Sequence, residues 1–130
     1  MGIWGDHTQY LLWLLDHGNI DNISPKAAVL MIGTNNSGNN TPEQIADGGR
    51  PSWKSCARSC RRPKILVLAI FPRGATPDDA RRKVNIVTNE RIAKLNDGQM
   101  IYFLYIGPKF VGDDGSLSKE VMPDLLHLKE

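Results

Sequence analysis

The chain has 130 residues, a length that predicts one domain, so residues 1–130 are taken as a single domain. A hydrophobic fraction of 41%, a charged fraction of 23% and a net charge of +2 are typical of a globular protein with no nucleic-acid partner. No apolar run reaches the roughly 20 residues of a membrane span, and no basic n-region of a secretory signal opens the chain, so we expect a cytoplasmic protein without a membrane span.

The first predicted element is a helix over residues 6–18. Asp6 is the candidate N-cap, and Gln9 stands three residues later, the spacing of a capping box. Gly18 follows the apolar stretch and is expected to end the helix, because glycine is favoured just beyond a helix C-terminus.

A nearly continuous apolar run at residues 26–33 predicts a strand that is buried on both faces of a parallel sheet. It leads into an asparagine-rich loop at residues 34–40, where Asn, Gly and Ser readily form turns. A second helix is expected to begin at Thr41, with Pro42 at the first helical position and Gln44 closing a capping box.

Residues 48–64 depart from the helical pattern, because they contain Pro51, no apolar period and no acid. Their basic residues are Arg50, Lys54, Arg58, Arg61, Arg62 and Lys64. We expect an irregular solvated loop, with a basic patch for an anionic partner or a local change of reading frame as the alternatives. Cys56 and Cys60 lack CxxC spacing and a nearby histidine, so no metal, redox site or cofactor is predicted.

Two further apolar runs, at residues 64–71 and 100–107, have the same strand character as the first. The helix between them is expected to begin at Thr76, with Asp79 three residues on, and to end at Gly98. Its predicted apolar stripe is Ala80, Val84, Val87, Ile92 and Leu95. The alternation of helices and strands predicts an α/β layer fold with right-handed crossovers.

Ligands of parallel α/β sheets bind outside the carboxyl ends of the strands, where three polar features of this sequence are expected to meet. Asp124 and His127 stand three residues apart, so the carboxylate can hold the imidazole Nδ1–H and leave Nε2 as a base. The amide of Asn35 and the backbone N–H of Gly5 are candidates to stabilise a developing oxyanion.

Together these features resemble the SGNH or GDSL hydrolases, nearest the platelet-activating-factor acetylhydrolase-like esterases. The resemblance covers the chain except about residues 49–63, and its motifs are GDHTQ (5–9), GTNN (33–36), PRG (72–74) and PDLLHL (123–128). It implies a three-layer α/β/α, flavodoxin-like fold with about three parallel strands in this chain. Gly5 and Asn35 match the block-II and block-III oxyanion donors, and Asp124 and His127 match the block-V pair. Asn36, Asn39 and Asn40 are expected to shape the loop.

The sequence departs from this family in one respect, because it contains no Gly-Asp-Ser, the block-I motif that supplies the nucleophile. By resemblance the chain starts just before block II and stops before the family's last helix, so a partial domain is expected. Ser37 is the best candidate for a nucleophile within the chain, since it stands two residues beyond Asn35. Ser116 and Ser118 are weaker candidates in a loop that approaches block V.

We therefore expect a hydrolase of small carboxylic esters that uses a His-Asp pair and an Asn/Gly oxyanion hole. The alternative is a catalytically inactive chain that folds as an oligomer. A homo-oligomer is expected in either case, because the resemblance leaves the strand at residues 26–33 at a sheet edge whose only charged residue is Lys26.

Overall fold

The structure is a computed structural model that describes residues 5–18, 25–59 and 64–129. Its elements, in chain order, are α1 (Thr8–Asp16), β1 (Ala27–Leu30), η1 (Thr34–Asn36), α2 (Pro42–Ser59), β2 (Lys64–Leu68), α3 (Ala80–Ala93), β3 (Ile101–Leu104) and η2 (Gly107–Phe110). All three predicted strands are present, although each is shorter than the apolar run that predicted it.

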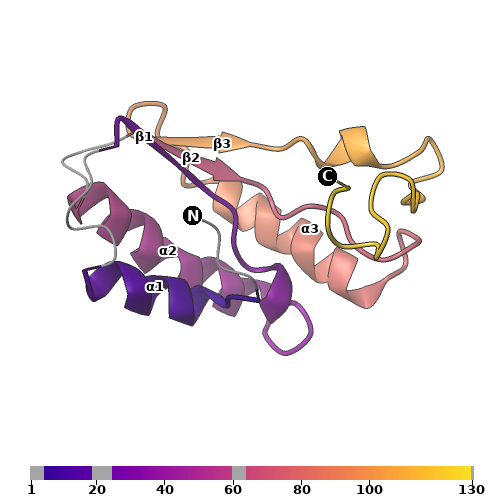
Figure 1. The fold of residues 1–130 in the computed structure, drawn as a ribbon, viewed down its shortest axis with the longest axis horizontal. Helices are drawn as coiled ribbons and strands as arrows, with labels where there is room; N and C mark the ends of the chain where they lie inside the picture. The colour runs from indigo at the N-terminus through magenta and orange to yellow at the C-terminus, as the bar shows by residue number, and fades with distance from the viewer. Residues whose placement is uncertain (1–4, 19–24, 60–63, 130) are drawn as a thin grey trace.

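The strands form one parallel sheet in the order β1-β2-β3 (Figure 1). Leu30 lies opposite Val67, and Val67 lies opposite Phe103, so the apolar runs are in register across the sheet. The predicted α/β class and parallel pairing are therefore confirmed. The strands run toward the same edge, which brings the loops after β1, β2 and β3 to one end of the sheet.

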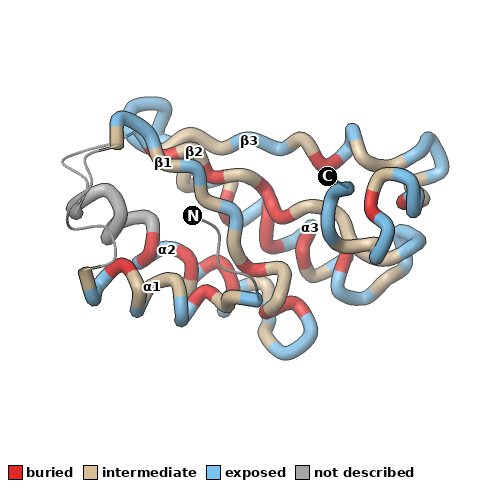
Figure 2. Tube along the Cα trace, in the orientation of Figure 1, coloured by how far each residue is buried: buried red, intermediate tan, exposed pale blue. Residues whose placement is uncertain are grey.

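The helices α1, α2 and α3 all lie on one side of this sheet (Figure 1). On that side Ile65 and Val67 of β2 are buried, and the core extends to Ile45 of α2 and Ile92 of α3 (Figure 2). Alternation along the strands leaves the opposite side open, where Val29 is 61% exposed, so the predicted burial of this strand on both faces is wrong for the described residues. Of the three implied layers, the described residues thus form the sheet and one helical layer.

The N-terminus of α2 is capped as predicted. The backbone N–H of Thr41 donates to Gln44 Oε1 at 3.0 Å, and the backbone N–H of Gln44 donates to Thr41 Oγ1 at 3.3 Å. These reciprocal bonds satisfy two donors that a helix N-terminus otherwise leaves unpaired. Pro42 occupies the first helical position, where its missing N–H costs nothing.

The N-terminus of α1 differs from its prediction, since the helix begins at Thr8 and Asp6 is not its N-cap. The Thr8 N–H instead donates to the side-chain oxygen of Asn36 at 3.1 Å. A side chain from another loop therefore takes the capping role that the local sequence assigned to Asp6. Gly18 adopts a φ of 85° just beyond the helix, as expected for a residue that ends it.

The third helix, α3, begins at Ala80, so the predicted start at Thr76 is wrong. Asp79 is its N-cap, because the Asp79 carboxylate accepts the N–H groups of Arg81 at 2.9 Å and Arg82 at 3.2 Å. The helix ends at Ala93, several residues before the predicted stop at Gly98.

The predicted apolar stripe of α3 is confirmed only in part. Ile92 is buried and Val84 and Leu95 pack against the core, but most of the fully buried residues of the helix are polar. Val87, a predicted stripe residue, is 40% exposed, whereas Asn85 and Asn89 are buried. Asn89 accepts the backbone N–H of Ile70 at 2.8 Å and donates to the Ile70 carbonyl at 2.9 Å. The helix therefore faces the chain leaving β2 with amides, because irregular backbone there needs hydrogen-bond partners.

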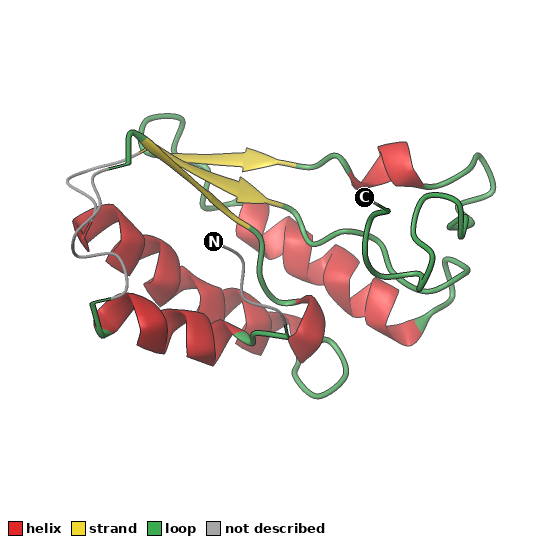
Figure 3. Ribbon diagram, viewed as in Figure 1, coloured by secondary structure: helices red, strands yellow, loops and turns green. Residues whose placement is uncertain are grey.

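Residues 48–59 continue α2, so the prediction of an irregular loop is wrong for this stretch (Figure 3). The buried positions Ile45, Gly49 and Ser52 recur at helical spacing, although two of them are not large apolar residues. Packing against α1 is close, since a Cβ at Gly48 would lie 2.7 Å from Thr8 Oγ1. Small residues thus create the contact that holds this part of the helix. Cys60, Arg61 and Arg62 lie outside the described residues.

Candidate active site

A pocket of about 180 Å³ opens at the carboxyl ends of β1 and β2. It is lined by Gly5, Asp6, Met31, Ile32, Gly33, Thr34, Asn35, Ile70, Phe71, Leu126 and His127. The turn before α1, the loop after β1, the segment after β2 and the C-terminal loop thus all contribute to its lining. The structure therefore places the three polar features of the sequence at one site.

The C-terminal loop presents Asp124 and His127 as a hydrogen-bonded pair. Asp124 Oδ2 lies 2.6 Å from His127 Nδ1, and Asp124 Oδ1 accepts the backbone N–H of His127 at 2.8 Å. The backbone N–H and then the side chain of His127 lower the pKa of the Asp124 carboxyl to about 2. Because the ionised carboxylate accepts from Nδ1–H, Nε2 becomes the basic nitrogen of the ring.

Asn35 lies in the short helix η1, directly after β1. Its Nδ2 donates one hydrogen bond, at 3.0 Å, to the backbone carbonyl of Asp6, which leaves a second amide hydrogen. Gly33 makes this turn possible, because its φ is 118° and a Cβ there would lie 2.7 Å from Ile45 Cγ2. The bond to Asp6 also joins the Asn35 turn to the segment that contains Gly5.

Asn36 has a structural role, as the sequence predicted. It is 1% exposed, its Oδ1 accepts from the Thr8 N–H, and its Nδ2 donates to Gln9 Oε1 at 3.2 Å and to Asn40 Oδ1 at 3.1 Å. Its amide therefore ties α1 to the loop after β1. The neighbouring amides Asn35 and Asn36 thus face different surroundings, one at the pocket and one in the interior.

The structure does not bring the predicted serine nucleophiles to the pocket. Ser37 is 5% exposed, and its hydroxyl donates to the Thr34 carbonyl at 2.6 Å, so it is buried and bonded to its own turn. Ser118 Oγ accepts the backbone N–H of Glu120, and neither Ser116 nor Ser118 lines the pocket. The geometry therefore argues against the assignment of Ser37, because an attacking hydroxyl must reach the base.

Two arginines that sequence reasoning did not single out, Arg73 and Arg82, bond the backbone of loops near the pocket without lining it. Arg73 contacts the Thr34 carbonyl, and Arg82, only 4% exposed, contacts three backbone carbonyls of the surrounding loops. Arg73 was noted only as part of the PRG motif. Arg82 lies in the first turn of α3, and no local signal distinguishes it from the exposed cations beside it.

Among the side chains that the structure describes, at residues 5–18, 25–52 and 64–129, no cluster of three or more His, Cys, Asp or Glu is arranged to hold a metal ion. No helix in the same ranges combines the length and the apolar composition that a membrane span requires.

The parallel sheet, with a pocket at the carboxyl ends of its strands, places the protein in the α/β class whose sites are built by the loops after the strands. The family model of the GDSL-like lipase/acylhydrolases matches residues 1–130. The chain therefore belongs to the GDSL-like lipase/acylhydrolase family.

Its relatives include platelet-activating factor acetylhydrolase IB subunits. The chain is 38% identical over 128 residues to subunit alpha1 of Homo sapiens, covering 98% of the chain and 54% of the relative. It is 38% identical over 130 residues to subunit alpha2 of Rattus norvegicus, covering 98% and 55%. The chain thus spans about half the length of the curated relatives it matches.

Solved structures share its fold. One from Streptococcus pneumonia has a TM-score of 0.79 at 22% identity, covering 96% of this chain and 62% of that one. Est24, a carbohydrate acetylesterase from Sinorhizobium meliloti, has a TM-score of 0.64 at 21% identity, covering 91% and 59%.

Proposed function

We propose that this chain contributes the base and the oxyanion donors of a site that hydrolyses small carboxylic esters. The observation that carries the proposal is the 2.6 Å contact between Asp124 and His127, with His127 and Asn35 lining one pocket. Family membership and the esterases among its relatives support the same reaction class.

In the proposed reaction His127 Nε2 removes a proton from the attacking hydroxyl as its oxygen bonds to the ester carbonyl carbon. The carbonyl oxygen becomes an oxyanion, which accepts hydrogen bonds from the second amide hydrogen of Asn35 and from the Gly5 backbone N–H. The oxyanion then collapses, the bond between the carbonyl carbon and the ester oxygen breaks, and His127 gives its proton to the leaving alkoxide. The acyl group is now on the attacking oxygen; where that oxygen belongs to a side chain, a water activated by His127 Nε2 releases the acid by the same steps. Asp124 orients the imidazole and stabilises its charged form. No serine of the described residues lines the pocket, so the attacking hydroxyl is left unassigned in this scheme.

Hydrolysis of p-nitrophenyl acetate by the purified chain tests the proposal. His127→Ala should abolish turnover, and Asn35→Ala should lower kcat by about 10²–10³, the usual scale for one oxyanion donor. The matched controls are His17→Ala, an exposed histidine directly after α1, and Asn39→Ala, an exposed amide of the same loop as Asn35. Equal turnover in all four variants would refute the assignment. A folded wild-type chain without turnover would favour the inactive alternative.

We also propose that the chain self-associates through β1. This strand is at the edge of the sheet, and on the helix-free side Val29 is 61% and Met31 46% exposed. An unpaired edge beside exposed apolar side chains favours pairing with another strand. A two-fold axis perpendicular to the sheet, between two β1 edges, would pair their backbones antiparallel and place the two open faces side by side.

Light scattering at micromolar concentration should therefore give at least twice the monomer mass. Val29→Lys, which adds charge to the open face, should shift the protein toward monomer. Ile86→Lys, at a position on α3 that is 44% exposed, is the control and should leave the mass unchanged. A folded wild-type monomer would contradict the proposal.

A further inference from the structure

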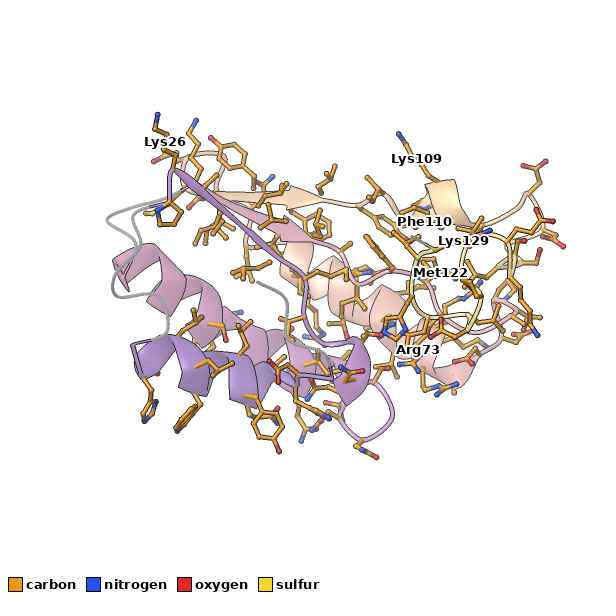
Figure 4. The ribbon with its side chains drawn as sticks, in the orientation of Figure 1. Lys26, Arg73, Lys109, Phe110, Met122 and Lys129 are labelled. Atoms are coloured by element: carbon orange, nitrogen blue, oxygen red, sulfur yellow. The ribbon has the colours of Figure 1, made fainter. Side chains whose placement is uncertain are left out.

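Arg73 lies on the segment that leaves β2, and Figure 4 shows its side chain between η1 and the C-terminal loop. Its Nη1 donates to the Thr34 carbonyl at 2.8 Å and lies 3.3 Å from Thr34 Oγ1 and 3.5 Å from Ser37 Oγ. Thr34 directly precedes Asn35. The guanidinium therefore holds the turn that presents the Asn35 amide to the pocket.

Gly74, the residue after Arg73, holds the turn that carries Asp124 and His127. The Gly74 N–H donates to the Leu125 carbonyl at 3.0 Å, and Leu125 stands between Asp124 and His127. Leu125 has a φ of 58°, and it is the only non-glycine residue with positive φ in the part of the chain that the structure describes. Such a conformation is costly for leucine and persists only where its surroundings impose it. The bond from Gly74 is one such constraint on this turn.

Arg82 holds the backbone of Arg73 and Gly74 in place through hydrogen bonds to their carbonyls. Its Nε donates to the Arg73 carbonyl at 2.8 Å, its Nη2 to the Gly74 carbonyl at 2.5 Å and its Nη1 to the Gly115 carbonyl at 2.6 Å. Arg82 belongs to the first turn of α3, which Asp79 caps. The pair is therefore anchored to a helix rather than to another loop.

The role of Arg73 depends on the direction of its hydrogen bonds rather than on an ion pair. Burial lowers the pKa of its guanidinium, so the surroundings disfavour its charge. Among the described residues it has no carboxylate within ion-pair distance, and its bonds go to a carbonyl and to hydroxyls. All three contacts come from one nitrogen, Nη1, and a lysine ammonium, on its flexible four-carbon stem, is expected to hold the turn less firmly than the planar guanidinium.

We propose that Arg73 is a positioning residue that sets the separation between Asn35 and His127, with its side chain on the Asn35 turn and the following N–H on the Asp124–His127 turn. The expected effect of Arg73 on kcat rests on the proposed ester hydrolysis. The coupling between the Asn35 turn and the Asp124–His127 turn rests only on the hydrogen bonds from Arg73 to Thr34 and from Gly74 to Leu125.

The kinetic test compares Arg73→Met with Lys83→Met, which removes the same charge from an exposed ion pair on α3. Because a displacement of about 1 Å in a site can cost about 10²-fold in rate, Arg73→Met should lower kcat on this scale while KM changes little. Lys83→Met should match the wild type. Arg73→Lys keeps the charge and one donor, so it should restore part of the lost kcat. Wild-type kcat in Arg73→Met would overturn the proposal.

A second measurement does not depend on turnover. In NMR spectra of the free chain, Arg73→Met should shift both the Asn35 side-chain amide and the His127 ring resonances, and Lys83→Met should shift neither. Unchanged resonances at either residue would overturn the proposal. If Arg73→Met does not fold, the Asn35 side-chain amide and the His127 ring resonances are measured in Arg73→Lys instead. Unchanged resonances at either residue would then overturn the proposal. A wild-type chain without turnover would remove the proposed function, and the spectra would still decide whether Arg73 couples the turns.

Discussion

Asn89→Ala is expected to be among the most destabilising changes of a polar residue in this protein. Asn89 is 6% exposed and makes two hydrogen bonds, at 2.8 and 2.9 Å, to the backbone of Ile70, which is itself 2% exposed. Alanine removes both bonds and leaves a buried N–H and a buried carbonyl without partners.

The magnitude follows from those two groups. Each orphaned buried polar group costs about 1–3 kcal/mol, so the loss should be about 2–6 kcal/mol. Alanine is the better helix former, but this gain is at most about 0.7 kcal/mol and does not reverse the sign. The loss is a large fraction of the roughly 5–15 kcal/mol by which domains are stable.

Urea unfolding followed by circular dichroism measures this loss as a change in the free energy of unfolding. Glu90→Ala is the matched control, because Glu90 is exposed on the same helix and should change stability by less than about 0.5 kcal/mol. Asn89→Asp separates the two bonds, since an ionised carboxylate accepts from the Ile70 N–H but cannot donate to its carbonyl. A loss below about 1 kcal/mol in Asn89→Ala would refute the reasoning.

Two further changes test the helix cap and the Asp124 turn. Thr41→Ala removes half of the capping box of α2 and should lower the free energy of unfolding by about 1 kcal/mol, whereas Thr41→Ser should restore it. The pKa of Asp124 falls from 3.8 to about 2 on folding, so its contribution to stability is present above pH 4 and should be lost as the pH falls toward 2. Asp124→Asn should flatten this part of the pH–stability curve, and an unchanged curve would contradict the contribution.

The sequence predicted the parts of the fold that depend on local pattern. The three strands were predicted from nearly continuous apolar runs, a pattern typical of parallel sheets, and they do pair in parallel. The capping box at Thr41 and Gln44 is also local, because both partners lie in one turn. The meeting of Gly5, Asn35 and His127 followed from the rule that parallel strands bring their carboxyl ends to one edge.

Features set by distant partners were missed. Asp6 has the right type and spacing for an N-cap, but Asn36 from another loop takes the Thr8 N–H. The amides of α3 have the composition of a surface face, but the chain after β2 packs against them, and the Ser37 hydroxyl is bonded within its own turn. Propensity and spacing report on neighbours in sequence, whereas these bonds join residues far apart in the chain or hidden within a turn.

Gly48 of α2 affects the pocket indirectly, through its contact with Thr8 of α1. Because this position has no side chain, α1 comes close enough to α2 that a Cβ there would meet Thr8. The same Thr8 gives its N–H to Asn36, the residue after Asn35. Any larger side chain at position 48 would push α1 outward and pull on the Asn35 turn, although position 48 does not line the pocket. A substitution at position 48 is thus expected to affect the candidate active site as well as the packing of α1 on α2.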